Sequence, residues 1–412
     1  MTRQTKGRRM RWVEVERPET KRISRATATK VLRAAVATAP DPLPLLERLG
    51  AALMDEGGHR EAIAAFDARA KADPARFTSW GRLAQCHNEI GEPATALAIC
   101  DRAGGHGARV ARARGAALEA LGRRDEALES YRRAFGEDET DAIALDAVLR
   151  LLCRAADAAP LLAFCDALPA TARFDVQKRA FRALACSRLG RREEASALID
   201  PERHVMSFRF DPACESGGVD AFNARLAGWL LANTGATPTP RRDCVHDYAL
   251  RHMRAPLLQE LRAFFRQSFD AYIAALPALG LDRLMPPPVA GDIADGATFL
   301  RNEARNGEHV HRGRYLTGVY YVHTPQAIRT NVERRGRLAV GRCHETAGGH
   351  EPVWGARYIA PEPGMFVVFP AHMFHDVVPT RCSEWRIAIV ADVEPAPIGG
   401  RELPMRYVQE RA

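Results

Sequence analysis

Three histidines and one arginine near the C-terminus have the types and spacing of a metal site with an anion-binding residue. His309 and His311 are separated by a single residue in the segment EHVHRGRYLTGVYYV. Side chains two residues apart in a strand point to the same side, so this H-x-H would bring both imidazoles to one face. His375 lies in a later apolar segment, and Arg386 follows eleven residues after it. Neutral imidazoles can hold a divalent metal with positions left open, and a guanidinium can bind a carboxylate through two hydrogen bonds.

The segments that carry these residues are expected to be strands of a small barrel. From Gly291 onward the chain consists of short β-rich runs bounded by Gly and Pro: ATFLRNEA, YLTGVYYVHT, GRLAVGRC, RYIAPE, GMFVVFP and WRIAIVADV. Two long helices are expected before them, at 220–232 and 245–276. About seven or eight strands after such helices predict a double-sheet jelly roll, whose interior has room for a metal and a small ligand.

The same segments resemble a known enzyme family. HVHRGRYLTGVYYV is similar to the first metal segment of prolyl-hydroxylase-type 2-oxoglutarate/Fe(II) oxygenases, in which H-x-D is followed by T-x-x-Y-Y. It is more similar still to a bacterial group in which tetratricopeptide repeats precede the oxygenase domain, and PEPGMFVVFPAHMFHDVVP resembles the second segment of that group. The resemblance covers about residues 295–395. It implies Fe(II) as cofactor, with 2-oxoglutarate and O2 as co-substrates.

The resemblance also implies a role for individual residues. His309 and His375 match the two iron-binding histidines, and His311 stands where the acid of H-x-D would be. Arg386 matches the base that binds the C5 carboxylate of 2-oxoglutarate. Tyr321 matches a tyrosine that helps to hold that carboxylate. Thr317 lies four residues earlier on the same expected strand face, so it could face the same cavity.

Two departures from the family pattern leave the ligand set open. With the acid of H-x-D missing, all three histidines could bind the metal. Alternatively, His311 and His375 could bind it together with water, as in the aspartyl β-hydroxylases and their H-x-G segment, with His309 outside the first coordination shell. The second departure is Ala388, where such enzymes often carry a serine that bonds the co-substrate.

The other acidic, cysteine and histidine residues near this motif are weaker candidates for metal ligands. Glu308 and Asp376 each adjoin a histidine of the motif and should point away from it if the strands are regular, and Glu303 lies further off. Cys343-His344 and His350 could indicate a second metal, but they lie in a Gly-rich loop without partner spacing, so we expect a solvated loop.

An internal repeat occupies the N-terminal half. Its signature is a Gly followed five residues later by an Ala that opens an amphipathic helix, and the glycines are spaced 34, 31 and 68 residues apart. The members are Gly57/Ala62, Gly91/Ala96, Gly122/Ala127 and Gly190/Ala195. Each unit is expected to form two antiparallel helices, with the Gly in a left-handed conformation at the end of the first. These units resemble tetratricopeptide repeats, and the doubled spacing allows one degenerate unit.

Composition and charge bound the remaining possibilities. Residues 1–40 contain eleven Lys and Arg and three Glu, a difference equal to the net charge of +8 for all 412 residues. The rest of the chain is balanced, so nucleic-acid binding is not expected beyond this basic leader. The nine cysteines form no C-x-x-C pair and no apolar run reaches membrane-spanning length, which favours a cytoplasmic protein without membrane insertion.

The sequence thus predicts an α+β protein, an α-solenoid followed by a jelly roll. The expected parts are a disordered leader at 1–40, repeats at 41–204, an oxygenase-like barrel at 205–400 and a tail at 401–412. The expected function is hydroxylation of a peptide or protein side chain presented by the repeats, which offer an extended surface. The alternatives are a non-catalytic repeat scaffold with a degenerate barrel, and an oxygenase that acts on a small molecule.

Overall fold

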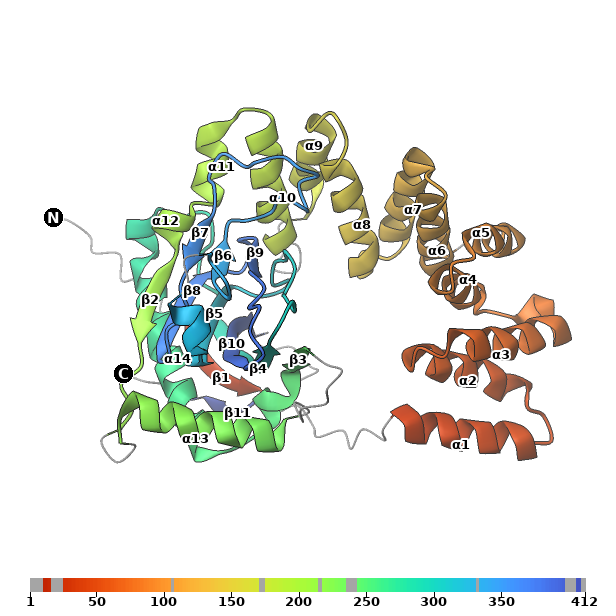
Figure 1. Cartoon of the computed structure of the whole chain (residues 1–412). Helices are drawn as coiled ribbons and strands as arrows, with labels where there is room; N and C mark the ends of the chain where they lie inside the picture. Colours follow the sequence, from red (N-terminus) through yellow and green to blue (C-terminus); the bar gives the residue numbers. More distant parts are fainter. Residues whose placement is uncertain are drawn as a thin grey trace. The chain divides into compact units, whose positions relative to one another are not determined.

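The computed structural model describes residues 10–15, 25–104, 107–169, 175–213, 217–234, 243–330, 333–396 and 405–408. The chain forms two compact units (Figure 1). The repeat unit is Glu19–Ala155, and the barrel unit combines Met1–Pro18 with Ala156–Ala412. Within the described residues, no helix is both long and apolar enough to span a membrane.

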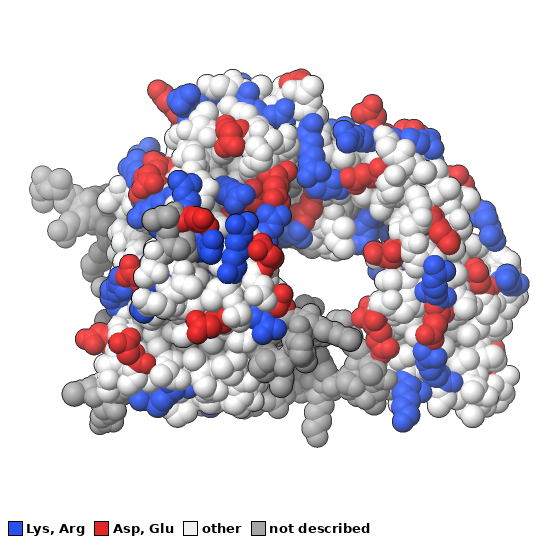
Figure 2. Space-filling model, in the orientation of Figure 1, with Lys and Arg blue, Asp and Glu red and all other residues white. Residues whose placement is uncertain are grey.

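The repeat unit consists of antiparallel helices around two clusters of buried hydrophobic side chains. Its elements are α1 (Arg25–Thr38), α2 (Leu43–Asp55), α3 (His59–Ala72), a 3-10 turn (Pro74–Arg76), α4 (Trp80–Glu89), α5 (Pro93–Arg102), α6 (Ala108–Ala120), α7 (Arg124–Glu137) and α8 (Ala142–Cys153). On the face shown in Figure 2, basic and acidic side chains are interspersed over these helices.

The repeat signature has the predicted structural cause. All four signature glycines have positive φ, at Gly57 (79°), Gly91 (82°), Gly122 (77°) and Gly190 (73°). At the first of them the Gly58 amide donates to the Leu53 carbonyl at 2.9 Å, which satisfies a carbonyl left open by the helix end. The four paired alanines are fully buried: Ala62, Ala96, Ala127 and Ala195. Helices α8 and α9 (Ala159–Ala167) occupy the interval of doubled spacing.

The barrel unit has helices outside two sheets. Its helices are α9, α10 (Asp175–Arg188), α11 (Arg192–Leu198), α12 (Pro201–His204), α13 (Gly218–Asn233), a 3-10 helix (Tyr248–His252), α14 (Pro256–Leu279) and α15 (Gln326–Arg329). Its strands are β1 (Arg11–Val15), β2 (Met206–Arg209), β3 (Cys244–Asp247), β4 (Ala290–Leu300), β5 (Leu316–His323), β6 (Leu338–Val340), β7 (Arg357–Ile359), β8 (Met365–Pro370), β9 (His375–Val377), β10 (Arg386–Pro395) and β11 (Met405–Val408).

The two sheets have the order of a jelly roll. The large sheet runs β11-β1-β4-β10-β5-β8-β2 with β3 paired to β4, and the small sheet runs β7-β6-β9. Side chains alternate along β5: Tyr320 and Val322 join the core that α13 and α14 complete, whereas Val319 lines the barrel cavity. This period of two is what brings polar residues of the strands into the interior.

The barrel unit begins earlier in the sequence than the boundary expected near residue 205. The last repeat-like helices pack on the barrel, with the ring of Phe181 in α10 lying 5.5 Å from that of Phe374. The buried His372 contacts the Leu198 carbonyl at 2.8 Å, and the Tyr272 hydroxyl donates to the His204 carbonyl at 2.7 Å. These helices bury their apolar face against the barrel, so they form part of its fold.

Two local expectations differ from the structure. Parts of the expected disordered leader are ordered: α1 packs Leu32 and Val36 on the repeat core, and β1 pairs with β4 in parallel. The rest of the leader, and most of the expected tail, lie outside the described residues. The helix expected from residue 245 begins at Pro256, because residues 244–247 pair with β4 as β3. Proline suits the first turn of a helix, so Pro256 marks that start.

Candidate metal and co-substrate site

The backbone brings the H-x-H segment and His375 together. His309 and His375 form an isolated antiparallel bridge in which each amide donates to the other's carbonyl at 3.1 Å. The His311 amide donates to the Ala371 carbonyl at 3.0 Å. The H-x-H therefore lies before β5 rather than within it, but the bridge keeps both rings on one side. One ring nitrogen from each of the three histidines lies within 4.8 Å of the others.

Hydrogen bonds fix the same tautomer in all three rings. Nδ1 of His309 lies 2.7 Å from the Gly307 carbonyl, and Nδ1 of His375 lies 3.0 Å from the Met373 carbonyl. Nδ1 of His311 lies 2.8 and 2.9 Å from the two carboxylate oxygens of Asp392. Carbonyls and carboxylates only accept hydrogen bonds, so we assign the proton to Nδ1 in each ring and a lone pair to Nε2.

The Nε2 lone pairs form a ligand set that suits a metal. Nε2 of His309 and Nε2 of His311 are 3.2 Å apart, and two lone pairs at that distance cannot hydrogen-bond to each other. A cation shared between them removes this repulsion. Imidazole ligands are compatible with iron, so the donor set fits Fe(II).

Burial keeps His309 and His375 in the neutral form that binds metal. Desolvation, with His311 as a second cause, lowers the pKa of His309 to about 4. Desolvation together with His309 and His311 lowers the pKa of His375 well below its ordinary value. Both rings are therefore unprotonated at neutral pH, and protons do not compete with a metal for them there.

Asp392 is a site residue that the sequence did not reveal. Arg386, Ala388 and Val390 line the cavity and alternate along β10, and Asp392 continues this alternation. The period of two was readable in the sequence, but Asp392 and His311 are 81 residues apart, so their contact was not. The acids adjoining the histidines make other bonds: Glu308 accepts from the amides of Glu345 and Thr346, and Asp376 pairs with Arg342 at 2.9 Å.

A buried guanidinium that has no counter-ion among the described residues lies in the same cavity. Arg386 is 1% exposed, and its Nε donates to the Gly336 carbonyl at 3.0 Å. Within the described part of the chain, its Nη2 has no hydrogen-bond partner, and neither has the hydroxyl of the fully buried Tyr321, whose ring lies 5.1 Å from the guanidinium carbon. Burial raises the pKa of Tyr321 to about 12, so its hydroxyl remains a donor. An unpaired buried charge costs several kcal/mol, so these donors indicate an anionic ligand.

One cavity is lined by the three histidines, by the arginine and by apolar side chains. His309, His311 and His375 line it together with Arg386, and Val319, Leu338 and Val377 lie in its walls. A dicarboxylate with one end at the metal and the other at Arg386 matches this distribution. Ala388, where a serine was considered, also lines the cavity and offers no hydroxyl.

Thr317 lies at a different end of β5 from Tyr321. It pairs in register with Asp392, whereas Tyr321 pairs with Ala388 close to Arg386. Its fully buried hydroxyl has no hydrogen-bond partner among the residues that the structure describes. The register therefore places Thr317 towards the histidine end, and a contact with the distal carboxylate is not supported.

The Gly-rich loop does not form a second cluster of metal ligands. His344 pairs with Glu351 at 2.8 Å, and Nε2 of His350 lies 3.0 Å from the Ser187 hydroxyl. In the described part of the chain, the three histidines are the one group with metal-ligand spacing.

A jelly roll with three converging histidines and a buried, unpaired arginine has the architecture of a metal-dependent oxygenase domain. Residues 297–392 match the family model described as "Putative 2OG-Fe(II) oxygenase". The family that this part of the chain matches implies Fe(II), 2-oxoglutarate and O2.

Solved structures with similarity fall into two groups. A Pseudomonas putida prolyl-4-hydroxylase is 14% identical over 47% of this chain and 93% of its own, with a TM-score of 0.31. The tetratricopeptide protein YrrB is 15% identical over 42% of this chain and 90% of its own, with a TM-score of 0.34. The first such domain of human RPAP3 is 22% identical over 26% of this chain and 88% of its own, with a TM-score of 0.25. Among curated proteins, none matches the chain.

Proposed function

We propose that the protein is a 2-oxoglutarate- and O2-dependent Fe(II) hydroxylase whose substrate is a peptide or protein side chain. The observation that carries the proposal is one cavity that joins three Nε2 lone pairs to an unpaired buried guanidinium. When bound, Fe(II) supplies the redox chemistry by which O2 oxidises 2-oxoglutarate to succinate and CO2 and places one oxygen atom in a substrate C–H bond.

The residues of the chain would bind and orient the reactants. His309, His311 and His375 hold Fe(II) from one side and leave the remaining positions open. Arg386 and Tyr321 bind the distal carboxylate, which directs the keto-acid end towards the histidines. The apolar walls of the cavity exclude water from the space between them.

A ligand set of three histidines is favoured over two. In each ring an acceptor holds the Nδ1 proton and leaves Nε2 free, and His309 has this arrangement as fully as His311 and His375. A histidine outside the coordination shell would not need this tautomer. Replacing each histidine by Ala in turn tests the set, and we expect each variant to lose most Fe(II) affinity.

The proposed role of the repeats is to bind the substrate. Stacked helix pairs present an extended surface, which suits a peptide segment or a folded protein better than a small metabolite. Replacing residues 19–155 by a flexible linker should preserve the succinate formation that occurs in the absence of a protein substrate. It should abolish hydroxylation of cellular proteins. The readout is the mass gain of one oxygen in peptides from cells that express either form. Unchanged protein hydroxylation would favour the small-molecule alternative.

The central experiment measures the co-substrate complex directly. Purified protein is mixed anaerobically with Fe(II) and 2-oxoglutarate, and visible absorption is followed for the metal-to-ligand charge-transfer band of a bound keto acid. Admission of O2 should then convert 2-oxoglutarate to succinate. A scaffold with a degenerate barrel would give neither the band nor succinate, and that result would exclude the proposed function.

A further inference from the structure

Asp392 holds a carboxylate beside the histidine cluster without reaching the position of a metal ligand. Both of its oxygens lie within 2.9 Å of Nδ1 of His311, and the residue is 8% exposed. It comes from β10, and its register partner on β5 is Thr317. The other two ring protons are held by the neutral carbonyls of Gly307 and Met373. His311 is therefore the one ring of the three that is bonded to a charged acceptor.

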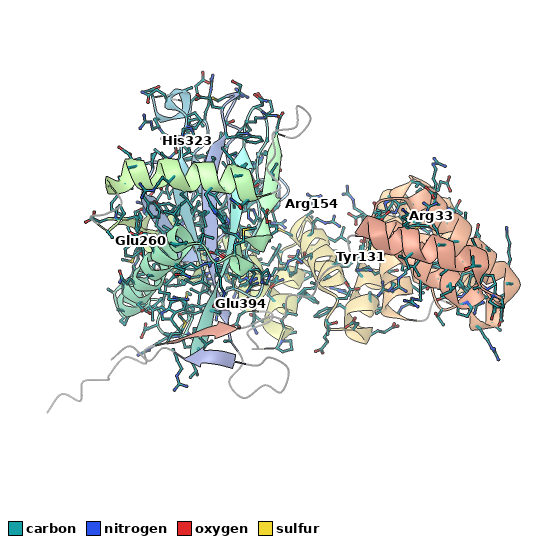
Figure 3. The ribbon with its side chains drawn as sticks, turned by 90° about the horizontal axis from the view of Figure 1, so that it is seen from below. Arg33, Tyr131, Arg154, Glu260, His323 and Glu394 are labelled. Carbon is teal, nitrogen blue, oxygen red and sulfur yellow. The ribbon has the colours of Figure 1, made fainter. Side chains whose placement is uncertain are left out.

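The surroundings of Asp392 fix its position. Arg314 Nε lies 3.7 Å from its second oxygen, and Nη1 of the same arginine lies 2.8 Å from Glu394. Glu394, two residues further along β10 and marked in Figure 3, also accepts from Arg251 at 2.7 Å. This row of alternating charges holds the carboxylate against His311.

We infer that Asp392 is a positioning residue that orients His311 and supplies, through its ring, the negative charge that the H-x-H sequence lacks. The inference rests on the proposed metal-binding role of the histidines. A carboxylate bonded to Nδ1 fixes the tautomer in which Nε2 carries a lone pair. It also makes Nε2 more basic and therefore a stronger metal ligand. In a facial triad the carboxylate binds the metal directly. Here the carboxylate of Asp392 bonds to His311 and not to the metal, and the His311 ring transmits its charge.

Two substitutions separate orientation from charge. Asp392→Asn keeps an oxygen that can accept the His311 proton but removes the charge, whereas Asp392→Ala removes both. Fe(II) affinity is measured anaerobically by calorimetry on the full chain. Loss of such a partner weakens metal binding by about 10- to 100-fold, so Asp392→Ala should fall in this range and Asp392→Asn should lie between it and the unaltered protein.

A matched control identifies general damage to the sheet. Asp295 on β4 is 4% exposed and pairs with Arg262 of α14 at 2.7 Å, on the helix-covered face of the same sheet. Asp295→Asn removes a buried carboxylate of the same sheet without touching the histidines. It should keep the Fe(II) affinity of the unaltered protein whatever it does to stability.

A second readout does not require metal. With ¹⁵N-labelled histidine rings, long-range ¹H–¹⁵N spectra of the metal-free protein report which nitrogen of His311 carries the proton. We expect Nδ1–H in the unaltered protein and in Asp392→Asn, and a shift to Nε2–H in Asp392→Ala. Full Fe(II) affinity together with an unchanged tautomer in Asp392→Ala would overturn the inference. Failure of the unaltered protein to bind Fe(II) would instead overturn the proposed function beneath it.

Discussion

At the residue scale, the co-substrate assignment depends on Arg386. Its guanidinium is enclosed, and its Nη2 has no acceptor within the described part of the chain. A hydrogen bond to a charged group contributes about 1.5–3 kcal/mol. The two donors that we assign to the distal carboxylate therefore supply much of the affinity for 2-oxoglutarate, whereas Fe(II) binding depends on other side chains.

Replacing Arg386 by Ala should reduce 2-oxoglutarate affinity by at least about tenfold, in line with the loss of one such bond, while Fe(II) affinity stays within a few-fold. Both are measured by anaerobic calorimetry. Arg301→Ala is the control, because Arg301 stacks on Trp385 at 4.4 Å and pairs with Asp243 away from the cavity. Equal 2-oxoglutarate affinity in both variants would refute the assignment of Arg386.

The histidine pKa values make the metal-free protein sensitive to acid. The folded pKa of His309 is about 4, below the value of about 6.5 for an unfolded histidine. Between these pH values the unfolded chain binds a proton that the folded state excludes, so the free energy of unfolding should fall as pH decreases from 7 towards 4. Urea unfolding at pH 7 and pH 5 tests this. The decrease should be smaller in His309→Asn, and an equal decrease would contradict the prediction.

The residues of the site could be predicted from the sequence only in part. The H-x-H spacing, His375 and Arg386 were recognisable because each follows a local pattern on an apolar segment. Asp392 was not, since only the pairing of β5 with β10 brings it to His311. Thr317 followed the same face rule as Tyr321, but the strand register places the two at different ends of β5.

At the element scale, the helices before residue 205 support the segment that carries His375. Phe181 packs on Phe374, and His372 bonds to the Leu198 carbonyl. Both contacts hold the residues directly before His375. The repeat signature at Gly190 predicted the helix pair correctly. It could not show what the pair packs against, because the buried face of a repeat helix looks the same whether its neighbour is another repeat or a sheet.

Two shortened chains test this support. Residues 1–18 joined by a linker to 156–412 should fold and bind Fe(II), because all elements of the barrel unit are present. Joining the same segment to 205–412 removes α9–α12 and should give a chain with exposed apolar surface and no Fe(II) affinity. Circular dichroism and calorimetry compare the two, and equal folding of both would show that these helices are dispensable.

At the scale of the whole molecule, the repeat unit is inserted between two segments of the barrel unit. The first segment places Met10 and Val13 in buried positions, and Trp12 Nε1 donates to Asp270 at 2.9 Å. The sequence predicted this segment as part of a disordered basic leader. The prediction missed β1 because the strand is short and its few apolar residues lie among many basic ones.

Deleting residues 1–18 should destabilise the barrel unit by a few kcal/mol, since burial of one Met or Val side chain contributes about 1.5–3 kcal/mol. The repeat unit should be unaffected, so denaturant unfolding should show one transition that moves and one that does not. Deleting residues 1–9 alone is the control and should change neither. A single unchanged profile for both deletions would mean that β1 contributes nothing to stability.

The position of β1 also has a consequence for biosynthesis. Trp12 leaves the ribosome early, but its partner Asp270 follows 258 residues later. At about 5–20 residues per second, the delay is roughly ten seconds to a minute. The helices of the repeat unit need only neighbouring partners and can fold during that delay, whereas β1 must wait. A strand translated before the repeat unit is thus among the last elements to reach its native place.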